Sequence, residues 1–304
     1  MNARTAYLLL SLTALFWGGN AVAGRLAAGE VSPMLLTAIR WVFALAILLV
    51  IGGRRLVDDW AVIRPNLPLL AAYGAFGFAG FNILLYSALN YTTAINVAIE
   101  QAGMPMLIFL ANFVLFRTAV TPIQILGFCL TLIGVALTTM HGDLTSLKEL
   151  QVNRGDALML IAIILYAGYT VGLRYRPNLH WQSLMIVMAA SALLAAIPFA
   201  IYEYASGGAI APSARGWAVA LYTAIFPAIL SQVFFMKGVA LIGSNRAGIF
   251  VNMVPLAGAA LSILILGESF QLYHAVALVL VLGGIWLSER SSLRSEKRDE
   301  RSAS

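Results

Sequence analysis

Apolar stretches of about twenty residues follow one another along almost the whole chain, and this repetition constrains the fold more than any other feature. A helix of about 20 apolar residues crosses a hydrocarbon core about 30 Å thick. Lipid offers the backbone no hydrogen-bond partners, so membrane-spanning segments with this pattern are helices. Charged residues make up only 11% of the chain, whereas soluble domains carry roughly 25%. The sequence therefore predicts an all-α integral membrane protein.

Charged, proline-containing and glycine-rich breaks divide the chain into ten predicted transmembrane helices. The predicted spans cover residues 5–27, 33–52, 67–88, 93–115, 122–140, 155–173, 182–202, 215–236, 245–266 and 271–288. Between the fifth and sixth spans lies a polar connection that resembles a linker. We therefore expect four regions, which are a first five-helix repeat (1–140), a periplasmic linker (141–154), a second five-helix repeat (155–288) and a cytoplasmic charged tail (289–304).

The distribution of basic residues predicts the orientation of these spans. Of the 19 Lys and Arg residues, fourteen fall on the side that carries both termini, four fall on the other side, and Arg40 lies within a span. Cytoplasmic loops carry an excess of Lys and Arg. We therefore expect both termini in the cytoplasm.

A shift of about 150 residues brings the two halves of the chain into register. Pro105 then lies over Pro255, and a shift one residue smaller places Arg25 over Arg174. Each half holds five predicted spans, and this odd number makes the second half enter the membrane in the opposite direction. The pattern predicts two inverted-topology repeats, as in alternating-access carriers, with a solute site near the midplane between them.

Three short motifs accompany this pattern, namely LFWGGN at 15–20, AIRW at 38–41 and LGESF at 266–270. Together with ten spans in two halves, they resemble the EamA family of the drug/metabolite transporter superfamily over nearly the whole chain. The likeness is greatest to the bacterial aromatic amino acid exporters. The family pattern has a glutamate before the last span of each half; Glu268 fits it, whereas Thr118 takes the matching place in the first half.

Polar and aromatic side chains recur three or four positions apart on six of the spans, a spacing that places them on one face of a helix. Amides and hydroxyls are kept away from lipid, so these faces are expected to point inward. For any one residue the alternative is packing between helices. Together they predict a solute-binding cavity formed by Trp17, Asn20, Phe78, Asn82, Tyr86, Asn96, Glu100, Tyr166, Tyr169, Gln232, Phe235, Asn245 and Asn252.

Three charged residues carry separate hypotheses. Glu100 is the only acidic residue clearly inside a predicted span, and a carboxylate at that depth is costly enough to indicate function. It either binds an ammonium group of the solute, carries a proton, or pairs with Arg40 at similar depth in the second span. Arg40 belongs to the family motif AIRW, which favours a structural or gating role. Lys237 is either a gating charge that binds a substrate carboxylate or a side chain that reaches lipid headgroups.

Pro105 and Pro255 occupy matching places in the fourth and ninth spans, where each permits a kink, and we predict a pair of hinges. His141, His180 and His274 have no metal-ligand neighbours at a useful spacing, so we assign no metal. The sequence has no phosphate-binding loop or ATP-binding domain, and we expect no cofactor. Its positive charge favours contact with lipid headgroups rather than nucleic acid.

These observations favour a secondary transporter of the inner membrane, not an enzyme, that exports small organic solutes by alternating access. Aromatic amino acids and related metabolites are the first solutes expected. Aromatic faces also attract cations, so organic cations and drugs are the alternative. Transport is either coupled to protons, with Glu100 as candidate carrier, or facilitated diffusion. A membrane enzyme would need a catalytic constellation that is absent, and a channel would need a ring of charges. The sequence leaves the oligomeric state open.

Overall fold

The computed structural model describes residues 3–117, 121–142 and 153–303. Within these ranges, helices are the only regular secondary structure. Eight of the described helices are long and apolar enough to cross a membrane, and two shorter apolar helices, Val254–Leu266 and Leu272–Ser288, follow them. The prediction of an all-α membrane protein is confirmed, and each of these ten segments overlaps one of the ten predicted spans. Most of the linker predicted at 141–154 lies outside the described residues, as does Thr118.

Most spans are single helices, but four of the described spans consist of consecutive pieces. The helices before residue 142 are α1 (Ala3–Ala27), α2 (Pro33–Asp58), α3 (Trp60–Ile63), α4 (Leu67–Ala72), α5 (Phe81–Ala88), α6 (Ala94–Gln101), α7 (Met104–Phe116) and α8 (Pro122–Thr139). Those after residue 153 are α10 (Arg154–Gly172), α11 (Trp181–Ala205), α12 (Ala214–Ile225), α13 (Ser231–Ile242), α14 (Ser244–Val251), α15 (Val254–Leu261) and α16 (Leu272–Ala303). Three π-helical segments join neighbouring pieces or end a span, namely η2 (Tyr73–Gly80), η4 (Phe226–Leu230) and η5 (Ser262–Leu266).

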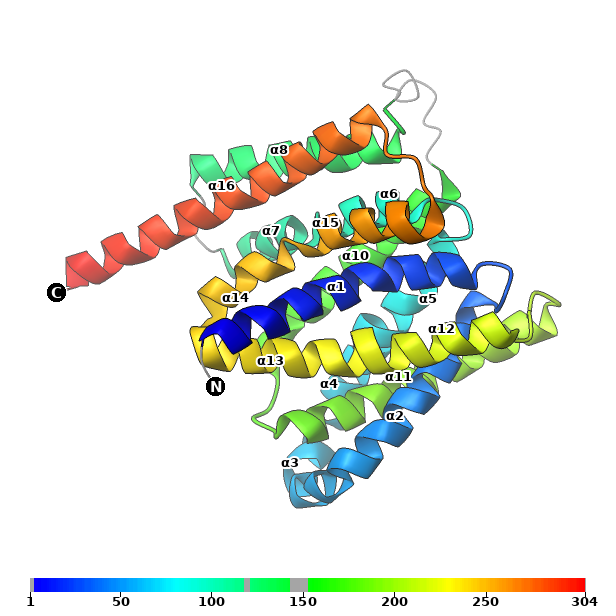
Figure 1. Ribbon diagram of the computed structural model, residues 1–304. Helices are drawn as coiled ribbons and strands as arrows, with labels where there is room; N and C mark the ends of the chain where they lie inside the picture. The colour runs from blue at the N-terminus through cyan, green and yellow to red at the C-terminus, as the bar shows by residue number, and fades with distance from the viewer. Residues whose placement is uncertain (1–2, 118–120, 143–152, 304) are drawn as a thin grey trace.

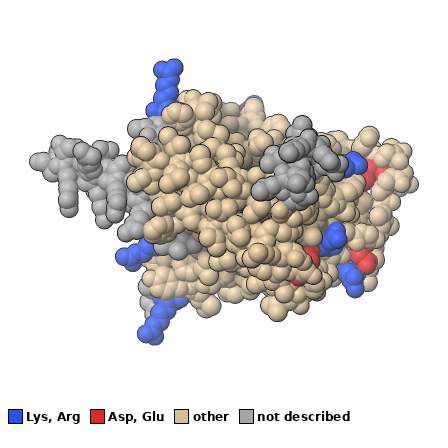
Figure 2. All heavy atoms as spheres, turned by 90° about the horizontal axis from the view of Figure 1, so that it is seen from above, with Lys and Arg blue, Asp and Glu red and all other residues tan. Residues whose placement is uncertain are grey.

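The helix ends gather on two faces of the molecule. Both chain ends lie on the left in Figure 1. We call this side the terminal face, and its described connections include Asp59, residues 176–180 and Gly243. The opposite face carries the connections at residues 28–32, 89–93, 206–213 and 267–271. On the side drawn in Figure 2, charged side chains lie toward these two ends, and an uncharged surface separates them. This separation is what a membrane-embedded belt requires.

Local sequence explains where several helices begin. Thr121 Oγ1 accepts a hydrogen bond from the Gln124 N–H, and Gln124 Oε1 accepts one from the Thr121 N–H, so that the two residues form a capping box at the start of α8. Thr93 caps α6 by accepting from the Asn96 N–H at 3.2 Å. Pro33 and Pro122 occupy first positions of helices, where a missing N–H costs nothing.

Two glutamates cap helices to which they are not adjacent in sequence. The Glu268 carboxylate accepts from the N–H groups of Ala94 and Ile95 at 2.9 and 3.0 Å. Glu203 accepts from Met34 and Leu35 at 3.3 and 3.0 Å. A carboxylate at a helix N-terminus satisfies free donors and compensates the positive end of the helix dipole. Both contacts therefore join the ends of separate spans on the opposite face.

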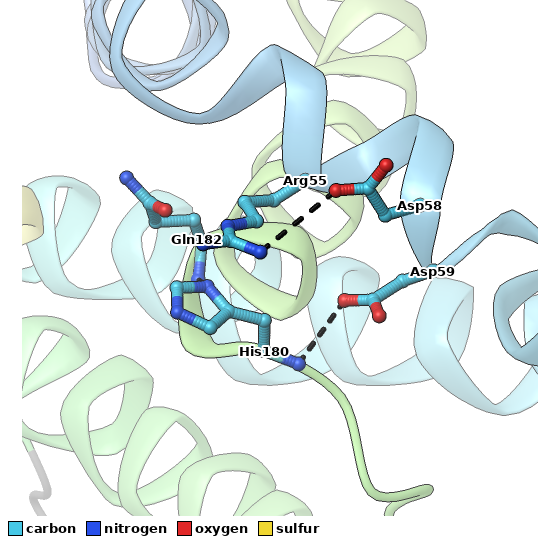
Figure 3. Close-up of polar contacts among 5 residues, drawn as sticks. All are labelled: Arg55, Asp58, Asp59, His180 and Gln182. Carbon is cyan, nitrogen blue, oxygen red and sulfur yellow. Dashed lines mark hydrogen bonds and ion pairs between the residues drawn. The ribbon is translucent and has the colours of Figure 1, made fainter.

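The second span is longer than predicted, because α2 continues past residue 52 to Asp58. Its last turn carries an Arg55–Asp58 ion pair of 3.8 Å. The Asp59 carboxylate then accepts from the backbone N–H of His180 at 3.1 Å, at the start of α11 (Figure 3). Polar side chains stabilise these turns where the helices leave the apolar layer, which is why hydropathy alone ended the span too early. Helix α16 likewise continues through the charged tail to Ala303.

Candidate functional site

A central cavity of about 420 Å³ lies among the spans. Nine of its side chains are aromatic or amide groups that the sequence predicted for solute binding. The lining residues include Trp17, Asn20, Arg40, Trp41, Phe78, Phe81, Asn82, Gln101, Pro105, Ile108, Tyr166, Tyr169, Thr170, Leu173, Pro227, Gln232, Phe235, Val251, Asn252 and Pro255. Small-molecule sites usually combine an apolar wall with a few placed polar groups, and this lining has that composition.

Arg40 is the centre of a buried hydrogen-bond network at one wall of the cavity. Its Nη1 donates to the side-chain oxygens of Asn20 and Asn82 at 3.1 and 2.7 Å, and to the Tyr86 hydroxyl. The Tyr86 hydroxyl in turn donates to Asn20 Oδ1 at 3.0 Å. Arg40 is 4% exposed and its Nε has no partner among the described residues. The network thus joins α1, α2 and α5 around one permanent cation.

Aromatic rings form a continuous second wall. Trp41 stacks flat on Phe78, with ring centroids 4.8 Å apart and planes 4° apart. Phe78 meets Tyr169 edge to face at 5.9 Å, and Tyr169 meets Tyr166 at 5.3 Å. Phe81 continues the series against Tyr166 at 5.0 Å. Edge-to-face and stacked contacts of this kind hold ring positions, so the wall offers a planar solute a preformed surface.

Trp17 lines the cavity where α1 meets η4 and α13. Its indole N–H donates to the Pro227 carbonyl at 3.3 Å, and its ring lies 5.5 Å from that of Phe235. Pro227 belongs to the π-helical segment η4, where the irregular backbone leaves this carbonyl accessible. The structure therefore orients Trp17 through a backbone contact that side-chain spacing does not reveal.

The two predicted hinge prolines both follow a break in a span. Helix α6 ends at Gln101 and α7 begins at Met104, with Pro105 in its first turn. Helix α14 ends at Val251 and α15 begins at Val254, with Pro255 in its first turn. Both prolines line the cavity. The breaks are established by the structure, whereas movement about them stays a prediction.

The structure brings most of the predicted solute-binding residues together, but not all. The residues that line the cavity are Trp17, Asn20, Phe78, Asn82, Tyr166, Tyr169, Gln232, Phe235 and Asn252. Tyr86 lies behind this lining within the Arg40 network, and Lys237 is exposed. Asn96 and Glu100 are fully buried elsewhere. The side chain of Asn245 lies outside the part of the structure that is described.

The suggested ion pair between Glu100 and Arg40 is not present in the structure. Arg40 donates to two amides and a phenol, whereas Glu100 Oε1 accepts from the Thr139 hydroxyl at 3.4 Å. The sequence places Glu100 and Arg40 at similar depth in their helices, but their side chains do not face each other. Glu100 therefore belongs to a different environment from the cavity cation.

Sequence reasoning missed two aromatic lining residues and one buried acid. Trp41 and Phe81 line the cavity. Each is adjacent in sequence to a predicted site residue, Arg40 or Asn82, and was therefore expected on another face of its helix. Neighbouring residues do not share a face of an α-helix, but the π-helical segment η2 widens the turn just before Phe81. Asp156 is fully buried in the first turn of α10, so Glu100 is not the only buried carboxylate. Asp156 was missed because it lies at the predicted start of the sixth span.

A comparison with protein families agrees with this architecture. The sequence model of the EamA-like transporter family matches residues 4–140 and again residues 153–290. The chain belongs to the EamA-like transporter family. It is a multi-span membrane protein of a family of transporters, and the two matches cover most of its length. The name of this family indicates transporters rather than enzymes.

Curated relatives carry similar names. The "uncharacterized transporter" YetK of Bacillus subtilis is 25% identical, over 93% of this EamA chain and 86% of its own length. An "uncharacterized transporter" of Archaeoglobus fulgidus is 27% identical, over 95% and 98%. Purine permease 3 of Arabidopsis thaliana is 27% identical, over 73% and 68%. One protein of known crystal structure is 19% identical, covers 97% of this chain and 100% of its own, and has a TM-score of 0.62. That likeness shows a shared fold.

Proposed function

We propose that this EamA-family protein is a secondary transporter of the inner membrane that exports solutes with a planar ring and a carboxylate, with aromatic amino acids as the first candidates. The observation that carries this proposal is Arg40, a buried cation facing a cavity whose described lining contains no carboxylate. A bound carboxylate would accept from a cation of this kind. The Trp41–Phe78–Tyr169 wall would contact the ring.

The same lining argues against organic cations as principal solutes. Aromatic faces attract cations, but the nearby guanidinium repels them, and no described acidic side chain lines the cavity. Purines form a second candidate class, because one relative bears the name purine permease and purines are planar and rich in hydrogen-bond acceptors. Adenine is therefore a useful competitor alongside amino acids.

Alternating access is part of the proposal. Helices α6 and α15 pack together on the opposite-face side of the cavity, where Gly258 lies against Ala98. Lining residues such as Ile108, Leu173 and Phe235 extend toward the terminal face. We therefore assign the structure to a state closed at the opposite face. Paired breaks in the fourth and ninth spans, and the family match to each half, support two inverted repeats that rock about a central site.

Counterflow in proteoliposomes tests the solute class. Proteoliposomes that contain the purified protein are loaded with unlabelled L-tryptophan, and the entry of labelled L-tryptophan is measured. Four competitors are added outside in separate assays, namely L-tryptophan, indole-3-propionate, tryptamine and adenine. We expect saturable counterflow that indole-3-propionate inhibits and tryptamine does not, since only the former keeps the carboxylate. Equal inhibition by tryptamine would show that Arg40 does not select a carboxylate. Strong inhibition by adenine alone would favour purines.

A further inference from the structure

A second group of ionisable side chains lies outside the solute cavity, toward the opposite face. Glu100, at the end of α6, and Asp156, in the first turn of α10, are both 0% exposed. Helices α6 and α10 pack together, and the two carboxylates are close enough to interact electrostatically. Two like charges in a buried region destabilise each other strongly.

These carboxylates lack the partners that buried acids usually have. Glu100 Oε1 has the long Thr139 contact and Asp156 faces the Thr92 hydroxyl, but Glu100 Oε2 has no partner among the described residues and neither oxygen of Asp156 has a hydrogen bond of good geometry. The ion pairs found among the described residues, Arg55–Asp58 and Arg215–Glu30, lie elsewhere. A buried ionised carboxylate without compensation is costly. Glu203 is the contrasting case, since both its oxygens accept backbone N–H groups.

Two histidines connect this pair with the opposite face through Asn96. His274 Nδ1 accepts from the Gln271 N–H at 2.9 Å, so its Nε2 carries the proton and donates to Asn96 Oδ1 at 3.0 Å. Asn96 Nδ2 then faces His141 Nε2 at 3.2 Å and donates to it. His141 is exposed, whereas His274 is 2% exposed. Asp156 interacts electrostatically with His141.

The other groups around the pair do not neutralise it. Tyr273 of α16 interacts electrostatically with both Asp156 and Glu268, and the Glu268 carboxylate is bound to the N-terminus of α6. Of the arginines at this end, Arg25 of α1 donates to the Leu89 carbonyl at 2.6 Å. Arg154 of α10 lies over the Tyr91 ring at 4.9 Å. Helix α15 contributes the small residue Gly258 against α6.

We propose that Glu100 and Asp156 form a proton-binding site, with His141 at its aqueous end, that couples proton movement to solute transport. The coupling rests on the proposed transport function, whereas the proton site itself does not. Hydronium transfers a proton to a carboxylate oxygen, which forms an O–H bond and leaves water. The reverse step returns the proton to water when the site faces the other side.

The position of Glu100 provides a route from protonation to the solute cavity. The next residue, Gln101, lines the cavity. The Gly103 N–H donates to the Glu100 carbonyl at 2.9 Å, across the break between α6 and α7. A change in charge at Glu100 therefore acts on the end of α6, directly beside the break that Pro105 follows.

Infrared spectroscopy of the protein in lipid bilayers tests the proton site without any solute. We expect a protonated carboxylic acid band at neutral pH that Glu100→Gln and Asp156→Asn each reduce, that the double variant removes, and that Glu203→Gln leaves unchanged. The amide bands in the same spectra report whether each variant keeps its helices. A wild-type spectrum without this band, or a band that the folded double variant retains at full strength, would refute the site.

Proteoliposome flux tests the coupling. We expect a pH gradient to drive L-tryptophan accumulation in the wild type and in Glu203→Gln, and expect this accumulation to be lost in Glu100→Gln and Asp156→Asn, which keep counterflow. Accumulation that follows a sodium gradient instead would refute proton coupling. Wild-type counterflow that ignores the pH gradient would also refute it while the transport function stands. The infrared band without transport of any tested solute would uphold the proton site and reject the proposed solutes.

Discussion

Arg40 introduces a permanent positive charge into the protein interior without a carboxylate beside it. Its described partners are two amide oxygens and a phenol, all neutral, and one guanidinium nitrogen has no partner. Neutral dipoles lower the cost of burying the charge but do not cancel it. The field in the cavity is therefore positive, and this is the main reason to expect anionic groups on the solute.

Replacing Arg40 with methionine tests this role. Removal leaves the oxygens of Asn82 and Tyr86 without the Arg40 donor, at a cost of about 1–3 kcal/mol for each group that stays unsatisfied, whereas Asn20 Oδ1 keeps the Tyr86 hydroxyl as a donor. We expect lower thermal stability in detergent and loss of L-tryptophan counterflow. Arg55→Met is the control, because its exposed ion pair with Asp58 contributes about 0–1 kcal/mol. Equal losses in both variants would contradict a special role for Arg40.

Gly77 is small because the Tyr169 ring occupies the space where a side chain would lie. Gly77→Ala would push Tyr169 away from Phe78 and disturb the aromatic wall. We expect L-tryptophan affinity to fall about tenfold, or about 1.4 kcal/mol. Affinity is measured by competition in counterflow. Gly168→Ala on α10 has open space around its new methyl group and should keep wild-type affinity; a similar loss there would argue against the ring contact.

At the residue level, helical spacing predicted the cavity face well but not its limits. Asn20 and Asn82 were found because amides in hydrocarbon must face inward. Phe81 was missed because the π-helical segment just before it changes which neighbours share a face, and the sequence YGAFGFAG does not predict that segment. Trp41 was missed because it directly follows Arg40 on α2, and neighbouring residues do not share a face of an α-helix. The His141–Asn96–His274 contact was also missed, because it joins three helix ends whose proximity depends on tertiary packing.

At the scale of elements, two helices approach each other closely where one of them carries a glycine. A methyl group on Gly18 would lie 2.6 Å from the Gly258 nitrogen and 2.9 Å from the Val254 carbonyl oxygen. These are backbone atoms of α15, so α1 and α15 would have to separate.

Gly18→Ala is therefore expected to destabilise the protein by about 1–3 kcal/mol. Thermal unfolding in detergent provides the measurement. Gly53→Ala is the matched control, since α2 leaves open space there and alanine favours a helix by roughly 1 kcal/mol. A Gly18 variant as stable as the Gly53 variant would contradict the close packing.

The broken spans make a separate prediction about movement. Pro105→Ala and Pro255→Ala restore a backbone donor next to each break and should favour continuous helices. We expect slower counterflow with little change in the concentration of L-tryptophan that half-saturates it. Stopped-flow exchange at saturating solute measures this rate. Unchanged rates in both variants would remove the hinge role. The sequence predicted the paired prolines, but the two-residue gaps before them required the structure.

At the scale of the whole molecule, the excess of Lys and Arg on the terminal face predicts that this face is cytoplasmic. Cysteine labelling checks it in intact cells, in a background in which the native, exposed Cys129 is replaced by alanine. A membrane-impermeant maleimide should label Gly208→Cys on the opposite face directly. It should label Asp59→Cys on the terminal face only after the membrane is made permeable. The reverse pattern would invert the proposed direction of transport.

The pairing of α8 with α16 has a consequence for biosynthesis. Gly127, Thr131 and Gly134 of α8 pack closely on α16 around Gly284 and Val281 (Figure 1). Helix α16 leaves the ribosome after all the other described spans. Until α16 is inserted, the face of α8 that carries Gly127, Thr131 and Gly134 must therefore be covered by lipid or by an insertion factor. Truncation before Leu272 should leave the nascent chain with an unpaired α8 and make it a target for membrane quality-control proteases.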